Sequence, residues 1–377
     1  MSPRSSTKVV FVPKVRTSGV TSERSPKMME MLSSVYDVTP VQPSRINDFV
    51  FDQRRNQMAR YLLFPADVGA NLLRTLRAIG RSRALVFAEG SYFSFAAGMA
   101  ARLKRVPMVW DNHGHIVKFA QVQGKSAFFT KGNVLFERIL VGLSSKVLVV
   151  NERDRQDYVS LGFEPGKLEV VPTCADLDLV GQRLRPREEA KWQLGIALDH
   201  KAVLFVGTLN YEPNLDAVAY LASIMPRLRA QVPEAKVYIA GSGPVPFAPP
   251  EGMEFLGFVP DLHLWLSAAD LCVAPMWKGL GILTKVIDYM SAERATVVTP
   301  LALDGIPELA HGENCLLGKD KEAFLLEAVR ALEDDGLRER IATQGRELIA
   351  RRYSCAVVMR SLTGLVDSLV ERGTILA

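Results

Sequence analysis

The stretch from residue 274 to residue 292 holds the residue types best suited to binding an anionic ligand. An apolar run ends at Pro275, and a loop bracketed by Gly279 and Gly281 follows it. A helix is predicted to begin at Thr284, because a hydroxyl side chain is a good N-cap. Backbone amides at the start of a helix attract anions, so this loop is a candidate phosphate site.

Two charged side chains of the predicted helix extend this candidate site. Lys285 and Asp288 are three residues apart and therefore share one face of the helix. Lys285 and the amides of the loop can grip a diphosphate, and Asp288 can accept hydrogen bonds from a ribose diol. The alternative is an ordinary ion pair on the surface of a connecting helix, and the residue types alone leave both interpretations open.

Two further glycine turns follow apolar runs in the same half of the chain. Gly207 ends one run and precedes a polar loop with Asn210 and a helix that begins near Pro213. Gly241 ends a second run, and the Gly-Ser-Gly-Pro sequence that reaches Pro244 is not a full dinucleotide fingerprint. Glycine at these positions lets a ligand approach the backbone, whereas the alternative is a plain strand-to-helix turn.

Parallel sheets are predicted to position these turns. Short apolar runs alternate with helix-period segments, first up to about residue 171 and again from residue 202. The 377 residues are too many for one core, so two doubly wound α/β domains with a cleft between them are predicted. The expected parts are a first domain over 1–180, a linker over 181–198, a second domain over 199–355, and a C-terminal helix over 356–377 that packs back on the first domain.

The order of these motifs resembles the retaining glycosyltransferases of family 4, which have the GT-B fold of two facing Rossmann-like domains. The resemblance is good over about residues 200–355 and looser in the first half. It rests on Gly207–Asn214, Gly241–Pro244, Gly257–Asp261, Ala269–Pro275, Gly279–Ser291, Gly305–Leu309 and Gly312–Leu317, with Pro107–Gly114 and Val170–Asp176 in the first half. Each motif is weak by itself, but the order and spacing together are specific.

The resemblance implies a nucleotide-sugar donor bound mainly by the second domain and an acceptor held mainly by the first, with no metal ion or other cofactor. The expected donor-binding residues are Gly207, Asn210, Gly241, Gly279, Gly281, Ile282, Leu283, Thr284 and Asp288. Leu280 stands where many relatives have a glutamate that contacts the donor sugar, and Leu283 stands where the family often has an arginine. Lys285 is therefore the expected cation beside the diphosphate.

Two histidines follow the apolar run near residue 110. The family often places a histidine that faces the donor sugar at the position of His113, and an imidazole can hydrogen-bond a sugar hydroxyl. A metal site of His113 and His115 is disfavoured because no third ligand is evident, and the remaining alternative is a loop histidine that caps a turn. His113 and Lys285 are thus the expected catalytic residues. The resemblance implies a retaining mechanism in which the leaving diphosphate takes the proton of the acceptor.

Charge is unevenly distributed along the chain. Residues 1–188 hold 28 Lys and Arg against 17 Asp and Glu, a formal charge of +11, whereas residues 189–377 carry −6. The stretch from residue 114 to residue 146 combines lysines with phenylalanines, which indicates an anionic membrane surface or a lipid-linked acceptor as a partner. The alternative is a solvated helix face whose apolar side lies in the core. Nucleic acid is not expected as a partner, because the aromatic motifs of RNA-binding proteins are missing.

Cysteine usage and hydropathy bear on the compartment. Cys174, Cys272, Cys315 and Cys355 share no close spacing, which favours neither a disulfide framework nor a zinc site and indicates a reduced cytoplasm. No apolar stretch approaches the roughly eighteen residues of a membrane span, and the N-terminus lacks a signal-peptide core. A cytoplasmic protein is predicted, with a peripheral position at the inner face of a membrane left open.

The sequence therefore predicts a glycosyltransferase of the hexosyltransferase type. It moves a sugar with retention from a nucleotide diphosphate onto a glycan, a lipid-linked acceptor or a small molecule. One alternative is a nucleotide-sugar 2-epimerase of the same fold, although the carboxylates and the histidine of its acid–base chemistry are not identifiable. The other is a nucleotide-sugar-binding subunit without catalysis, which Leu280 and Leu283 keep open.

Overall fold

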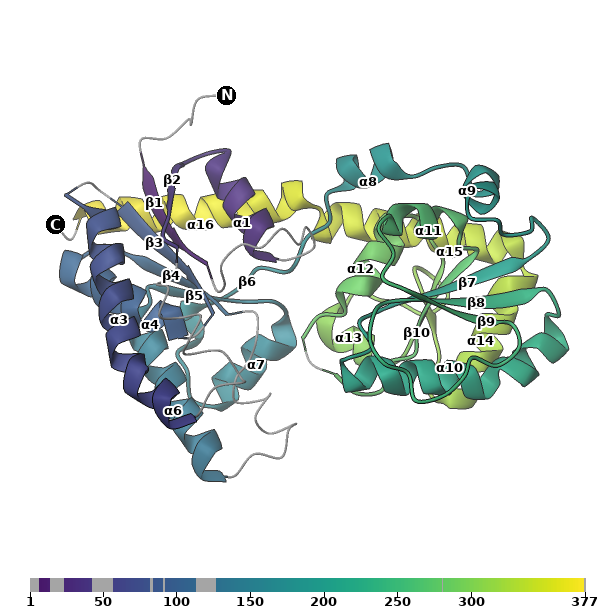
Figure 1. The fold of residues 1–377 in the computed structure, drawn as a ribbon. Helices are drawn as coiled ribbons and strands as arrows, with labels where there is room; N and C mark the ends of the chain where they lie inside the picture. Colours follow the sequence, from purple (N-terminus) through teal and green to yellow (C-terminus); the bar gives the residue numbers. More distant parts are fainter. Residues whose placement is uncertain are drawn as a thin grey trace. The chain divides into compact units, whose positions relative to one another are not determined.

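The chain folds into two compact units, each built on its own parallel sheet (Figure 1). The computed structural model describes residues 7–13, 24–42, 57–81, 84–90, 92–112, 127–279 and 281–375. The first unit spans residues 1–172 and 359–377, and the second unit spans residues 173–358. The predicted α/β class with two Rossmann-like domains is confirmed. Within the described ranges, no helix is long and apolar enough to cross a membrane.

A six-stranded sheet forms the centre of the first unit. Its strands are β1 (Lys8–Val12), β2 (Asp37–Pro40), β3 (Ala84–Glu89), β4 (Met108–Asp111), β5 (Lys146–Val149) and β6 (Leu168–Val170). They lie in the order β2-β1-β3-β4-β5-β6, and all neighbouring pairs are parallel. Every residue of β3 and β4 is buried, as expected for parallel strands that are covered on both faces.

Helices cover both faces of this sheet. They are α1 (Arg24–Ser33), α3 (Gln57–Ile79), α4 (Tyr92–Lys104), α6 (Ala127–Leu143), α7 (Glu152–Ser160) and most of α16 (Cys355–Ile375), with a 3-10 turn at Pro165–Lys167. α4 packs against both α3 and α6, whereas α1 and α16 lie on the other side of the sheet (Figure 1). The hydroxyl of Tyr36 lies 3.0 Å from the carbonyl oxygen of Thr363 and 2.8 Å from Asp367 Oδ1, which fixes α16 to the first unit.

The second unit repeats the architecture with a different strand order. Its strands are β7 (Lys201–Val206), β8 (Ala235–Ala240), β9 (Met253–Gly257), β10 (Leu271–Ala274), β11 (Thr296–Val298) and β12 (Leu316–Leu317). The order across the sheet is β12-β11-β10-β7-β8-β9, again with parallel neighbours. After β9 the chain returns to the other side of β7, where it forms β10. Because β7 and β10 are neighbours in the sheet, the loops that follow these two strands start next to each other.

The helices of the second unit begin before its first strand. They are α8 (Leu177–Arg183), α9 (Arg187–Gln193), α10 (Glu212–Gln231), α11 (Leu262–Ala268), α12 (Thr284–Ser291), α13 (Leu301–Gly305), α14 (Lys321–Glu333) and α15 (Asp335–Leu348), with a π-helical turn at Ile349–Tyr353. Residues 181–198, for which the sequence predicts a linker, contain the end of α8 and all of α9. Both helices pack against α11, and the backbone amide of Arg185 donates a hydrogen bond to Ser267 Oγ at 3.0 Å. This segment belongs to the second unit.

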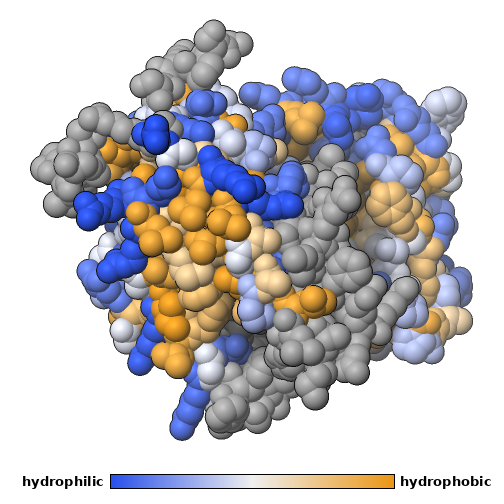
Figure 2. Space-filling view, turned by 60° about the vertical axis from the view of Figure 1, so that its left-hand side comes forward, coloured by the Kyte–Doolittle hydropathy of each residue, from blue (hydrophilic) through white to orange (hydrophobic). Residues whose placement is uncertain are grey.

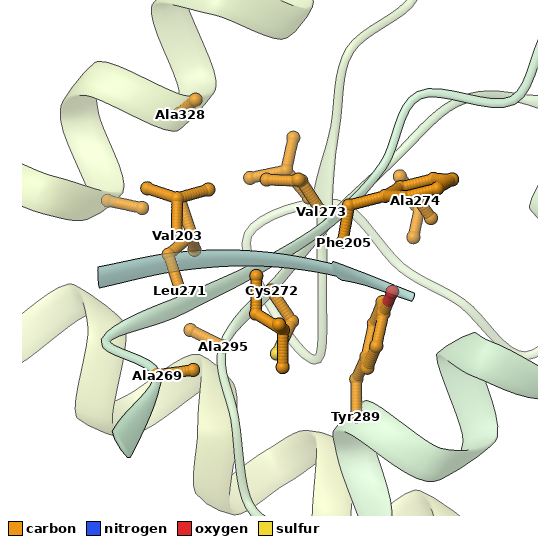
Figure 3. Packing of buried hydrophobic residues seen from close by; sticks show 14 of the residues in the cluster. Val203, Phe205, Ala269, Leu271, Cys272, Val273, Ala274, Tyr289, Ala295 and Ala328 are labelled. Atoms are coloured by element: carbon orange, nitrogen blue, oxygen red, sulfur yellow. The ribbon is translucent and has the colours of Figure 1, made fainter. Parts of the chain in front are cut away.

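The centre of the second unit lies around β7 (Figure 3). Val203 and Phe205 of this strand are buried, with Ala328 of α14 on one side of the strand and Tyr289 of α12 on the other. The backbone amide of Val206 donates a hydrogen bond to the hydroxyl of Tyr289 at 2.7 Å. α12 is thereby fixed to the carboxyl end of β7, which holds the first turn of α12 in place as well.

A disulfide links Cys174 to Cys355, so the prediction of four reduced cysteines is wrong for this pair. The two residues are 181 positions apart in the sequence, and no spacing rule could pair them. They meet because Ala175 and Ser354 form a parallel β-bridge next to them. Cys272 and Cys315 are free and buried. The inference of a reduced compartment loses its basis, since it rested on unpaired cysteines.

Candidate functional site

Lys285 occupies the first turn of α12 and lies among side chains of three other segments. Its Nζ is 2.7 Å from Asn214 Oδ1, 3.7 Å from Met276 Sδ and 4.1 Å from the centre of the Phe205 ring. Among the described residues, no carboxylate forms a salt bridge with this ammonium. The ammonium therefore keeps hydrogen-bonding capacity and charge for an anion.

Burial changes the acidity of Lys285. The side chain is half-buried, and loss of hydration lowers its pKa to about 7. Asn214 supplies only a neutral oxygen, which replaces one water molecule but does not restore the charge balance that a carboxylate would give. A bound anion would restore that balance, so the site favours a negatively charged ligand.

Asn214 is the residue that links Lys285 to the loop after β7. It lies buried in the first turn of α10, and its Nδ2 donates to the carbonyl oxygen of Thr208 at 2.8 Å. Its Oδ1 faces Lys285. Both ends of the amide are thus occupied, and the side chain holds the lysine beside the strand end. Asn210 is the asparagine of this loop that the sequence predicts as a donor-binding residue; it is exposed, and the hydrogen bond to Lys285 comes from Asn214 instead.

The start of α12 differs from the prediction in its N-cap. Leu283 is the N-cap residue and forms no side-chain hydrogen bond, while Thr284 is the first helical residue and is exposed. The prediction of Thr284 as N-cap is therefore wrong. Because leucine cannot accept a hydrogen bond, the first amides of α12 have no side-chain cap. An anion placed there would supply the missing acceptor.

The loop that precedes α12 takes a shape that its glycines permit. Gly281 has φ +72°, which disfavours other residue types, and a Cβ atom there would meet nothing within 4 Å. This side of the loop is therefore open at Gly281. The neighbouring Ile282 is held from behind by α13, because a Cβ atom on Gly305 would lie 2.8 Å from Ile282 Cα. Leu280 falls outside the described residues.

The glycines after β7 and β8 have a packing role in addition to the ligand approach that the sequence predicts for them. A Cβ atom on Gly241 would lie 1.9 Å from the carbonyl oxygen of Gly207, and one on Gly243 would lie 2.7 Å from the amide nitrogen of Asn210. The amide of Leu209 also donates to the carbonyl oxygen of Ser242 at 2.8 Å. These glycines let the two loops approach each other, and Gly207 also leaves room for Asn214, whose Nδ2 would be 2.7 Å from an added Cβ.

The remaining predicted donor residues lie on or beside α12. Asp288 is half-buried one turn after Lys285, and no ion pair joins these two described residues, which disfavours the surface-pair alternative. Leu283, at the position where the family often has arginine, is 9% exposed and packs into the core of the second unit. The second unit thus brings Lys285, the glycine loop and Asp288 to one region, at the carboxyl ends of β7 and β10.

The first unit contains a buried polar group at the carboxyl end of β4. His113 and His115 lie outside the described residues, but Asp111 just before them is fully buried. Its carboxylate accepts hydrogen bonds from Arg24: Nε donates to Oδ2 at 2.9 Å and to Oδ1 at 3.2 Å, and Nη2 donates to Oδ1 at 2.9 Å. Arg24 Nη2 also donates to the carbonyl oxygen of Val171 at 2.8 Å. The start of α1 is thereby tied to the ends of β4 and β6.

Two of these contacts could not be found from the motifs alone. Asn214 follows Pro213 in the matched motif, and a polar residue in the first turn of a helix is a weak signal by itself. Arg24 carries no motif at all, and its partner Asp111 is 87 positions away. In the described ranges no group of three or more His, Cys, Asp or Glu side chains could hold a metal ion.

Two family profiles match the chain, one for each unit. The profile described as "Glycosyltransferase Family 4" matches residues 37–179, and the one described as "Glycosyl transferases group 1" matches residues 200–334. The chain is 26% identical over 245 residues to TuaC of Bacillus subtilis, a glycosyltransferase named as a candidate for teichuronic acid biosynthesis; the match covers 64% of this chain and 58% of TuaC. It is also 26% identical over 188 residues to a D-inositol 3-phosphate glycosyltransferase of Mycobacterium bovis, covering 45% of this chain and 37% of that protein. The chain thus spans 58% or less of the length of these curated relatives.

Solved structures with the same fold cover nearly the whole chain. A sucrose-phosphate synthase from Thermosynechococcus elongatus superposes with a TM-score of 0.71 at 14% identity, over 97% of this chain and 100% of that chain. HepE from Anabaena in complex with UDP-glucose superposes with a TM-score of 0.68 at 15% identity, over 96% and 99%. At this level of identity the likeness establishes the fold.

Proposed function

Because the chain belongs to the GT-B glycosyltransferases, with a family 4 domain and a group 1 domain, we propose that it transfers a hexose from a nucleotide diphosphate sugar with retention of configuration. The acceptor is a glycan, a lipid-linked molecule or a small molecule. The second unit binds the donor, and the first unit holds the acceptor. The proposed co-substrate is the nucleotide sugar, and the proposal requires no metal ion or other cofactor.

The observation that carries this proposal is the environment of Lys285. A half-buried ammonium lies beside an uncapped helix start and an open glycine loop, and its nearest polar partner is the neutral Asn214. Such a site binds a diphosphate through one cation and several backbone amides. The acidic overall charge of this half of the chain cannot attract phosphate, so the local groups must do so.

The proposed reaction needs stabilisation of the leaving diphosphate above all. The bond between the anomeric carbon and the diphosphate oxygen breaks, and the acceptor oxygen bonds to the same face of the sugar. The acceptor proton passes to the leaving diphosphate. Lys285 and the amides at the start of α12 would bind the charge that develops on that diphosphate. Asp288 would accept hydrogen bonds from the ribose, and His113 would face the donor sugar.

The nature of the donor and acceptor follows by analogy with two of the compared proteins. HepE was solved with UDP-glucose, which makes a UDP-hexose the first donor to test. The mycobacterial relative is named for an inositol phosphate, and the first half of this chain carries a formal charge of +11. A phosphorylated or membrane-bound acceptor would match this charge, and a position at the inner face of a membrane is part of the proposal.

Donor turnover by the purified full chain tests the proposal. UDP-, GDP- and ADP-sugars are incubated with and without acceptors, and release of the nucleoside diphosphate is measured together with the anomeric configuration of the product. We expect turnover of one donor class, an at least about tenfold loss with Lys285→Ala, and little change with Lys278→Ala. Lys278 is a matched control, because it belongs to the same loop but is exposed and pairs with Asp216 at 3.2 Å.

Other outcomes would select the alternatives. Tight donor binding without turnover on any acceptor would identify a nucleotide-sugar-binding subunit, which the buried Leu283 in place of arginine would then explain. Interconversion of two nucleotide sugars without an acceptor would identify a 2-epimerase. Unchanged binding and turnover in Lys285→Ala would refute the site itself.

A further inference from the structure

One side of the first unit carries an exposed surface of one charge sign. It consists of α3, α6 and the C-terminal end of α4, and we call it the α3–α6 face. The exposed charged side chains described on these three helices are Arg74, Arg77, Arg102, Lys104, Lys131 and Arg138. Their two acidic side chains, Asp67 and Glu137, are 3% and 0% exposed. All of the described exposed charges on the face are therefore positive.

Large apolar side chains lie among these cations. They are Leu63 and Leu73 on α3, Leu103 on α4, and Leu135 and Ile139 on α6, with Leu103 and Leu135 67% and 62% exposed. Figure 2 brings this side of the molecule forward and shows hydrophobic surface bordered by hydrophilic side chains. A solvated helix turns its apolar stripe to the core and mixes both charge signs outside. α3 and α6 have buried apolar stripes and a second set of apolar residues that point outward.

A cationic hollow lies at one end of this face, where α4 and α6 end. It has a volume of about 590 Å³ and is lined by Arg102, Arg105, Lys167 and the end of α6 with the residues after it, 142–145. The Nζ of Lys167 donates to the carbonyl oxygens of Val141 and Ser144, both at 3.0 Å, so it already adds positive charge at the end of α6. No acidic side chain lines the hollow.

We propose that the α3–α6 face is a docking surface for an anionic lipid bilayer, and that the hollow of Arg102, Arg105 and Lys167 receives a phospholipid phosphate. Leucines at the level of the lipid head groups enter the acyl boundary, while the surrounding cations bind anionic head groups. Leu103 is flanked in sequence by Arg102 and Lys104, which is the combination that such a surface requires.

The charge of the face selects a membrane over the other occupants. A second copy of the chain would bring the same face against itself, and a symmetric contact would oppose one set of cations with another. A strongly acidic protein would satisfy the cations but would not require five separate exposed aliphatic side chains. An anionic bilayer offers phosphates to the cations and an apolar interior to the aliphatic side chains. This docking supplies the membrane-held acceptor that the proposed function allows, but it does not depend on which donor is used.

Vesicle co-sedimentation of the full chain tests the proposal without any turnover. Binding is compared between vesicles of phosphatidylcholine alone and vesicles that also contain phosphatidylglycerol, at low and at high salt. We expect binding to the anionic vesicles only, and weaker binding at high salt. The double variant Arg102→Glu/Arg105→Glu should lower the bound-to-free ratio by at least about tenfold. The variant Leu103→Ser/Leu135→Ser should lower it by about threefold or more, because less apolar surface enters the bilayer.

Matched controls come from the second unit. Arg340→Glu/Arg351→Glu reverses two exposed cations there, and Leu326→Ser removes an exposed leucine of α14. These variants should leave binding within about twofold of the parent chain, and thermal unfolding should confirm that all variants are folded. Three results would overturn the proposal: a chain that ignores phosphatidylglycerol vesicles at low salt, equal losses in the controls, or a dimer that Leu103→Ser/Leu135→Ser dissociates. Donor hydrolysis measured without vesicles reports separately on the proposed function.

Discussion

The ammonium of Lys285 donates a hydrogen bond to Asn214 Oδ1 at 2.7 Å, and this contact joins α12 to α10 across the end of β7. Phe205 of β7 lies beneath the same ammonium, with its ring centre 4.1 Å away. Tyr289, one turn further along α12, is fixed to the backbone of β7. Lys285 is thus held by neutral groups on both sides, and its charge remains available for a ligand.

A substitution of Asn214 should alter donor binding even though Lys285 itself is kept. In Asn214→Asp a carboxylate would lie where the amide oxygen now lies, so it would pair with Lys285 and raise the pKa of the lysine. We expect donor affinity to fall by about tenfold, because the diphosphate must compete with an internal anion. Isothermal titration with a nucleoside diphosphate measures the change. Gln231→Glu, at the exposed C-terminal end of α10, is the control, and an equal loss there would mean that general repulsion by the added charge is responsible.

Donor binding should weaken as the pH rises above 7. Burial lowers the pKa of Lys285 to about 7, so in the free protein the ammonium is mostly present below this pH and is lost above it. A diphosphate binds the charged form and stabilises it, so binding takes up a proton, about half of one per site at pH 7. Affinity should be flat at low pH and then fall by up to about tenfold per pH unit.

Titrations in buffers of different ionisation enthalpy measure this proton uptake directly. A nucleotide sugar is the suitable ligand, because its diphosphate is a diester and does not titrate in this range. Lys285→Arg keeps its charge at all these pH values and should remove the dependence on pH. A pH profile that is unchanged in Lys285→Arg would assign the titration to another group.

Sequence motifs group the residues of the candidate site in the second unit, but they do not predict its internal contacts. Lys285, Gly281 and Asp288 are close in sequence and share a loop and a helix, so local patterns suffice to group them. Asn214 is 71 positions from Lys285, and only the strand order of the second sheet makes them neighbours. The N-cap was misassigned to Thr284 because a favourable side chain is only a weak guide to where a helix starts.

For the fold, too, local sequence patterns predict some features and miss others. The alternation of apolar runs and helix-period segments predicts most of the strands and the longer helices of both units, but it does not predict α1, α8, α9, α13 or β12. β12, with two residues, and α13, with five, are too short to give a periodic signal. Gly207 and Gly241 were predicted to admit a ligand, yet their structural neighbours are each other. A glycine pattern shows that something approaches the backbone closely, but it does not show what.

Gly207→Ala should lower both stability and donor affinity. The added Cβ atom would lie 2.7 Å from Asn214 Nδ2, so the amide must shift and Lys285 with it. We expect the free energy of unfolding to fall by about 1 to 3 kcal/mol, the usual effect of overpacking. Urea unfolding and donor titration measure the two effects. Gly181→Ala is the control: this helical glycine has nothing within 4 Å, so alanine there should be neutral or slightly stabilising.

The disulfide between Cys174 and Cys355 should contribute to the stability of the second unit. It closes a loop of 181 residues beside the bridge of Ala175 and Ser354, and it limits the freedom of the unfolded chain. We expect Cys174→Ser/Cys355→Ser to lower the free energy of unfolding by about 2 to 4 kcal/mol, measured by urea unfolding. In the parent chain a reductant should lower the unfolding midpoint, whereas in the double variant it should have no effect. Thiol titration in denaturant should find Cys272 and Cys315 reactive before reduction and all four cysteines after it, and four reactive thiols in the oxidised protein would contradict the bond.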